Sequence, residues 1–146
     1  MLYTKKIFLF SLLLSLLAAG TMLFSTGTPA YAGEPAQLIT LKGESGTISP
    51  ESVKVKLGTT VVWYNSGPGP AKIEFTTKIG LACSVPVNFY GDLFGHYESA
   101  AIPVGGTASI CFIREGEYEY KVTRMVSKGT DKPFEVSSKG KIISIK

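Results

Sequence analysis

Apolar and polar residues alternate along most of the chain after residue 33, with the period of two that is typical of β-strands with one buried face. No stretch there has the periodicity of a helix. Short strands separated by turns are typical of two sheets packed face to face. We therefore predict an all-β fold, a two-sheet Greek-key β-sandwich of about seven strands. The predicted strands cover residues 38–41, 53–57, 59–65, 71–75, 108–112, 118–122 and 141–145.

Residues 78–106 do not follow this alternation, and they are too many for a simple turn. We predict an irregular excursion from the sandwich, with one helical turn near residues 90–94. The excursion holds an aromatic cluster and the single histidine of the chain. Aromatic residues are favoured at interfaces, so this cluster is a possible contact surface, and a small core beneath a loop is the alternative. The cluster comprises Phe89, Tyr90, Phe94, His96 and Tyr97.

The N-terminus has the three parts of a secretory signal peptide. A basic start is followed by an apolar run over residues 7–19 and then by Ala30-Tyr31-Ala32. We predict that residues 1–32 are the signal peptide and that cleavage leaves one domain, residues 33–146. The protein is then exported to a periplasmic, other extracytoplasmic or thylakoid-lumen-like space.

An uncleaved membrane anchor is the alternative to cleavage. The apolar run can be extended to Phe24, which brings it close to the roughly 20 residues that span a bilayer. The formal net charge of +4 includes Lys5 and Lys6, so it is weak support for an anionic partner. Basic residues form no block, and nucleic-acid binding therefore has little support.

The chain has two cysteines, Cys83 and Cys111. In an exported protein such a pair favours a disulfide over a metal site. Cys111 alternates with Ile110 and Phe112, so its side chain points away from the core, towards whatever covers that sheet. We expect the disulfide to attach the excursion to the sandwich.

Three segments share motifs with a known family. Residues 48–65 contain a Val-x-Val, a Gly-x-x-Val and Trp63-Tyr-Asn65; residues 102–120 end in Gly116-Glu-Tyr-Glu-Tyr120; residues 139–145 form a closing strand after a glycine. In this order they resemble the cupredoxins, small blue-copper β-sandwich proteins. The resemblance covers about residues 37–146 and includes the excursion only in position. It implies a cupredoxin-like fold.

The copper chemistry of that family does not carry over. A type 1 site needs two imidazoles, one thiolate and usually a weak axial thioether. The resemblance puts the first histidine at Ala71, the cysteine at Val122 and the second histidine at Met125, and residues 126–138 hold neither Met nor Gln. We therefore predict a degenerate copper site with no metal or cofactor, and interpret these positions as an apolar plug.

We expect a binding or structural module with an unknown protein or envelope partner, and not an enzyme. A nucleophilic cysteine beside His96 would need a free thiol, which a disulfide removes. The alternative is a copper-binding or electron-transfer protein with an altered site that uses Cys83, Cys111, His96 and Met125, because soft sulfur ligands suit Cu(I). A half-exposed loop histidine is the simpler interpretation of His96.

The segment 123–133 is basic, because it holds Arg124, Lys128 and Lys132. We expect it to lie at the end of the sandwich where the family places its copper. A solvated loop is the simpler interpretation, and a contact with an anionic partner is the alternative.

Overall fold

A computed structural model describes residues 35–127 and 132–146 of the chain. The predicted signal peptide and its cleavage site lie outside these residues. No helix in the described ranges has the length and apolar character needed to cross a membrane. The strands are β1 (Ala36–Lys42), β2 (Thr47–Ser49), β3 (Ser52–Lys56), β4 (Thr60–Asn65), β5 (Ala71–Phe75), β6 (Phe89–Gly91), β7 (Tyr97–Ser99), β8 (Thr107–Cys111), β9 (Gly116–Val126) and β10 (Phe134–Ile145).

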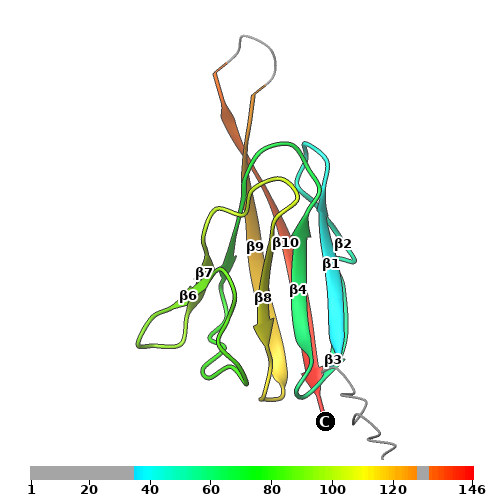
Figure 1. Ribbon diagram of the computed structural model, residues 1–146, viewed down its shortest axis with the longest axis vertical. Helices are drawn as coiled ribbons and strands as arrows, with labels where there is room; N and C mark the ends of the chain where they lie inside the picture. Colours follow the sequence, from blue (N-terminus) through cyan, green and yellow to red (C-terminus); the bar gives the residue numbers. More distant parts are fainter. Residues whose placement is uncertain (1–34, 128–131) are drawn as a thin grey trace, which may run out of the picture. The chain divides into compact units, whose positions relative to one another are not determined.

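The strands form two mixed sheets (Figure 1). One has the order β2-β1-β4-β8 and the other the order β3-β10-β9-β5-β7-β6. β1 runs parallel to β4 and β3 parallel to β10, and the other pairs are antiparallel. The predicted all-β, two-sheet sandwich is confirmed. The described residues contain ten strands instead of about seven, because β2, β6 and β7 add three short ones.

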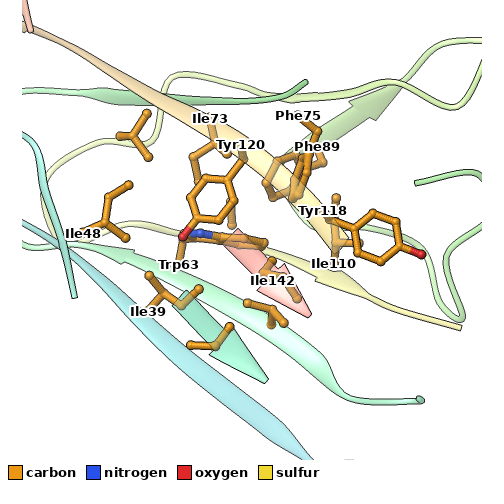
Figure 2. Packing of buried hydrophobic residues seen from close by; sticks show 14 of the residues in the cluster. Ile39, Ile48, Trp63, Ile73, Phe75, Phe89, Ile110, Tyr118, Tyr120 and Ile142 are labelled. Carbon is orange, nitrogen blue, oxygen red and sulfur yellow. The ribbon is translucent and has the colours of Figure 1, made fainter. Parts of the chain in front are cut away.

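The core lies between the sheets and is centred on Trp63 of β4 (Figure 2). The rings of Phe75, Phe89 and Tyr120 meet the Trp63 ring in edge contacts, with centroids 5.8, 5.5 and 5.4 Å away. Such edge-to-face contacts are favourable arrangements for buried aromatic rings. Phe89 belongs to the predicted contact surface, but its side chain is buried in this core, so it is not a surface residue.

The excursion connects the two sheets. Its β6–β7 hairpin extends the six-stranded sheet, because β7 pairs with β5 through Glu98 and Glu74. Residues before the hairpin pair with the free edge of β8 and its continuation, Val87 with Ser109 and Ala82 with Phe112. The predicted helical turn near residues 90–94 is wrong, since these residues belong to a β-hairpin.

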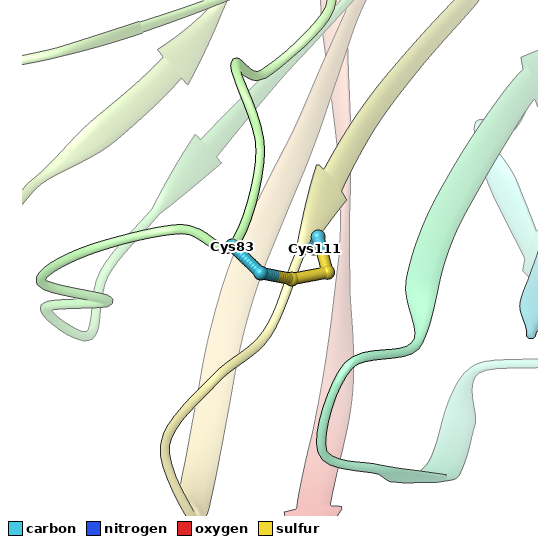
Figure 3. The surroundings of a disulfide bond; sticks show 2 residues. All are labelled: Cys83 and Cys111. Carbon is cyan, nitrogen blue, oxygen red and sulfur yellow. A yellow bond between two sulfur atoms is a disulfide. The ribbon is translucent and has the colours of Figure 1, made fainter. Parts of the chain in front are cut away.

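The predicted disulfide between Cys83 and Cys111 is present, with Cα atoms 5.3 Å apart (Figure 3). Cys111, the last residue of β8, is buried, whereas Cys83 is exposed. The backbone N–H of Cys83 also donates to the carbonyl of Cys111 over 3.3 Å. The excursion is therefore joined to the four-stranded sheet by a covalent bond and by backbone hydrogen bonds.

Candidate functional site

Strand β9 continues well beyond the predicted end of its strand. Every second side chain of the strand faces inward, and these are Tyr118, Tyr120, Val122, Arg124 and Val126. The strand then pairs with β10 up to the register of Val126 and Phe134. The first four residues of the segment expected to be a basic loop, 123–126, therefore belong to strand β9, and the guanidinium of Arg124 is buried instead of solvated. Lys128 lies outside the described residues, and Lys132 is exposed.

Of the three positions that match the copper ligands, two share the inner face of the six-stranded sheet and the third does not. Ala71 and Val122 are buried on the inner face of the six-stranded sheet, each with 1 % of its surface exposed. Met125 is 52 % exposed and lies on the outer face of β9. The inward residue opposite Ala71 is Arg124. Ala71 and Val122 belong to the apolar core, as the interpretation of a plug requires, but Met125 does not, and the cationic side chain of Arg124 lies beside Ala71.

The Arg124 side chain crosses from the six-stranded sheet to the loops at the end of the four-stranded sheet. Nη2 donates to Oδ1 of Asn65 over 2.7 Å. Nη1 donates to the carbonyl of Gly43, in the β1–β2 turn, over 2.9 Å and to that of Pro68 over 3.3 Å. One guanidinium therefore binds two segments that are far from it and from each other in the sequence, the β1–β2 turn and residues 65–68.

Asn65, the last residue of β4, is the main partner of Arg124 and is fully buried. Its Oδ1 also accepts from the backbone N–H of Gly67 over 3.2 Å. Its Nδ2 donates to the carbonyls of Gly69 and Ile102 over 3.0 and 2.9 Å. An amide can both accept from a guanidinium and donate to carbonyls, which neither a carboxylate nor a hydrocarbon can do. We call Arg124, Asn65 and the groups they bind the Arg124–Asn65 network.

Gly67 leaves the space that the guanidinium fills. A Cβ atom added at this glycine would overlap Nη1 and crowd Cζ of Arg124. The turn cluster of residues 66–70 therefore does more than reverse the chain, because its glycine lets a planar cation lie against the backbone.

The electrostatics of the network are those of a buried cation held by neutral acceptors. No ion pair among the described residues involves Arg124. Burial lowers the pKa of its guanidinium from the ordinary value. Carbonyl and amide oxygens carry enough partial charge to bind a guanidinium, which supplies five donors in a fixed plane.

These residues do not fit a type 1 copper centre. Ala71 and Val122 have no donor atom, and the Met125 thioether is on the opposite face of its strand. A guanidinium beside them would repel a metal cation, and the nearby oxygens already accept its hydrogen bonds. Among residues 35–127 and 132–146, no three His, Cys, Asp or Glu side chains gather in a way that could hold a metal ion.

The other candidate residues lie apart from this network. In the aromatic cluster, Tyr97 is half-buried, whereas Tyr90, Phe94 and His96 are exposed. The altered copper site would need thiolates from Cys83 and Cys111, and in the disulfide neither sulfur is free.

The sequence reasoning missed Asn65, Gly67 and the inward direction of Arg124. The alternation of Tyr118, Tyr120 and Val122 contained the signal for Arg124, because the same parity continued by two residues makes residue 124 face inward.

Among the comparisons with known proteins, only the solved structures bear on the architecture. No protein-family model and no curated protein matches the sequence. A reduced amicyanin variant is similar in structure, with a TM-score of 0.52 and 18% identity over 80% of this chain and 88% of that chain. A second amicyanin variant, with Cu(I), has a TM-score of 0.51 and 19% identity, again over 80% of this chain and 88% of that chain.

A purple cupredoxin from Nitrosopumilus maritimus gives a TM-score of 0.47 and 18% identity over 74% of this chain and 98% of that chain. At such low identities, the amicyanin matches describe the fold and not the chemistry. Together with the two mixed sheets and the order of their strands, they show that this chain has the cupredoxin fold.

Proposed function

We propose that this chain is an exported cupredoxin-fold protein that acts as a binding or structural module, and neither as a type 1 copper protein nor as an enzyme. The observation that carries the proposal is the Arg124–Asn65 network, in which a buried cation lies beside Ala71. The disulfide supports export, because such bonds persist in oxidising compartments. The N-terminal sequence pattern supports it independently.

The network also gives a physical reason why the fold can do without a metal at this end. A type 1 metal joins the segments that supply its ligands. In this chain the guanidinium joins the β1–β2 turn, the 66–70 loop and β4 through hydrogen bonds. The hydrogen bonds thus hold these loops in place without a metal ion.

Copper titration tests the proposal. The protein, exported by cells that carry the complete coding sequence and purified without a histidine tag, is mixed with Cu(II), desalted and assayed for metal and visible absorption. We expect no intense visible band and less than one bound copper per chain. A strong blue thiolate band with one copper per chain would contradict the proposal.

The matched control is His96→Ala, which removes the one imidazole of the chain. His96 is exposed, so weak copper binding that disappears in this variant is surface binding. Stoichiometric copper that survives the substitution would also contradict the proposal, because it would require a specific copper site formed without histidine.

A further inference from the structure

The β6–β7 hairpin and the adjoining end of β5 surround a hollow of about 310 Å³. This volume is at the lower end of the range for binding sites and suits a single side chain. Among the described residues that line the hollow, none is a lysine or an arginine. Its carboxylates, aromatic rings and imidazole belong to Glu74, Tyr90, Asp92, His96, Tyr97 and Glu98.

Two of the carboxylates lie directly opposite each other on neighbouring strands. Glu74 of β5 and Glu98 of β7 are partners in the register of the sheet, and both are exposed. Like charges at such positions repel each other. The ammonium of Lys72 lies 2.8 Å from Oε2 of Glu98, so it compensates one of the two charges.

Glu74 forms no ion pair within the described ranges. On its other side Glu74 is opposite Lys121 of β9, whose ammonium forms its ion pair with Glu135 over 3.5 Å. The carboxylate of Glu74 is therefore the uncompensated charge at the side of the hollow, and it can accept hydrogen bonds from a cation outside the chain.

The third carboxylate, Asp92, is fixed by the turn of the hairpin. Its Oδ1 accepts from the backbone N–H groups of Phe94 and His96 over 2.8 and 2.9 Å. These hydrogen bonds, above all that from His96, lower the pKa of the Asp92 carboxyl group, which is therefore ionised at neutral pH. Within the described part of the chain no hydrogen bond reaches Oδ2, so this oxygen is a further acceptor at the rim.

Two tyrosine rings supply the apolar part of the lining. Tyr90 of β6 is 65 % exposed and is opposite Glu98 in the register of the hairpin. The ring of Tyr97 lies against Gly91, where an added Cβ atom would be 2.8 Å from Cε1 of the ring, so the absence of a side chain at this position makes room for it. Aromatic faces attract cations. The rings and the carboxylates of the hollow therefore favour the same class of ligand.

We propose that this hollow binds a basic side chain, lysine or arginine, of a partner protein, with the charged group against Glu74 and Glu98 and the alkyl stem against Tyr90. This inference rests on the proposed role as a binding module and names the chemical group that the partner supplies. Carboxylate oxygens match the N–H donors of an ammonium or guanidinium group, which a quaternary ammonium lacks. A metal ion is a poorer match, because no three His, Cys, Asp or Glu side chains in residues 35–127 and 132–146 gather in a way that could hold one.

The surroundings of the hollow favour a protein as the source of the cation. Leu93 and Phe94, in the turn beside it, are 101 % and 74 % exposed. A partner protein can cover these side chains while it inserts its basic group, whereas a free small cation would leave them in water. One basic side chain by itself should bind with a dissociation constant in the millimolar range, because exposed ion pairs and cation–π contacts each contribute little.

An NMR titration with single side chains tests the inference. The exported protein is isotopically labelled and mixed at low ionic strength with the N-acetyl methylamide of lysine, of arginine or of norleucine, which has a similar stem without a charge. We expect the amide signals of residues 74, 90–92 and 96–98 to shift and to saturate with the two basic compounds and to stay unchanged with norleucine. Added salt should weaken the binding, because it screens exposed charges.

Substitutions locate the site. Glu74→Gln should weaken binding about two- to fivefold. Glu117→Gln is the matched control, because Glu117 is an exposed glutamate of the same sheet whose ion pair with Lys141, at 2.9 Å, lies outside the hollow, and it should leave binding unchanged. Tyr90→Leu should weaken binding about two- to fivefold, and Tyr90→Phe, which keeps the aromatic face, should restore it.

Three results would overturn the inference. The first is an equal response to the norleucine compound, and the second is equal weakening by the two glutamate substitutions. The third is saturable binding of phosphocholine at these residues without binding of the basic compounds, since that identifies a lipid headgroup as the ligand. Copper titration decides the proposed function separately, so the two failures can be told apart.

Discussion

Arg124 of β9 donates from Nη2 to Oδ1 of Asn65 of β4 over 2.7 Å, and this hydrogen bond joins the two sheets at one end of the sandwich. Both residues are almost completely buried. Removing one partner from a buried charged contact costs more than replacing the charge by a hydrocarbon of similar volume, because it leaves an uncompensated charge. We therefore expect substitution of Asn65 to destabilise the protein more than substitution of Arg124 by an apolar residue.

We predict that Asn65→Ala lowers the free energy of unfolding by at least about 3 kcal/mol, because it removes four hydrogen bonds and leaves the guanidinium short of an acceptor. Arg124→Met should cost only about 1 kcal/mol, since methionine fills the space without a charge. The double variant should lose about 1.5–3 kcal/mol less stability than the sum of the losses in the two single variants. Urea denaturation of the four proteins measures this coupling.

Met125→Ala is the control for that cycle. Met125 neighbours Arg124 but is half-exposed on the opposite face, so its substitution should change stability by less than about 0.5 kcal/mol. Strictly additive losses for Asn65→Ala and Arg124→Met would show that the hydrogen bond contributes nothing to stability.

Gly67→Ala should destabilise the protein by roughly 2–4 kcal/mol, because the added methyl group would force the guanidinium out of its place. In the Arg124→Met background the same substitution should cost less than about 1 kcal/mol, since the flexible thioether can move. Thermal unfolding of the two pairs gives the comparison. Equal losses in both backgrounds would mean that the backbone of Gly67, and not the cation, sets its requirement for glycine.

The alternation of side chains predicted seven of the described strands and the two-sheet architecture, because each of those strands has a buried face long enough to be recognised. The three that were missed, β2, β6 and β7, have three residues each. Three residues give too little alternation to separate a strand from a loop. β2 pairs only with the preceding strand β1, and β6 with the following strand β7. The pairing of β7 with β5, through Glu98 and Glu74, joins residues far apart in the sequence and has no local signal.

At the candidate site, the positions of Ala71 and Val122 followed from the motifs, but the direction of Met125 did not. A match to a family motif assumes that the backbone follows the family, with a loop after residue 122. In this chain β9 and β10 pair up to Val126 and Phe134, so strand parity decides which side chains face inward. The long-range partners of Arg124, such as the carbonyl of Gly43, have no local signal.

Loss of the disulfide should weaken the domain measurably. In the chain-entropy model, the bond between Cys83 and Cys111, 28 residues apart, contributes about 3–4 kcal/mol by restricting the unfolded chain. The double variant combines Cys83→Ser with Cys111→Ala, because a polar serine fits the exposed position and a small apolar alanine fits the buried one. We expect its urea midpoint to fall accordingly and to become independent of reductant.

The wild type treated with a reductant should approach the stability of that double variant. Far-ultraviolet circular dichroism before denaturation provides the control that both proteins start from folded sheets. If the reduced wild type keeps its full stability, the backbone pairs of the excursion with β8 hold it without help from the covalent bond.

Alkaline pH should destabilise the fold through Tyr120. Burial raises the pKa of this phenol from 10.0 to about 12. Between these two values the unfolded chain releases the proton while the folded chain keeps it, so the stability present below pH 10 falls as pH rises towards 12. The loss over this window is about 2–3 kcal/mol.

The variant Tyr120→Phe tests this assignment, because it keeps the ring against Trp63 but has no proton to release. The free energy of unfolding of this variant should not show the loss that the wild type shows as the pH rises. Urea midpoints of both proteins from pH 9 to 11.5 measure the difference, and parallel curves would contradict the assignment to Tyr120.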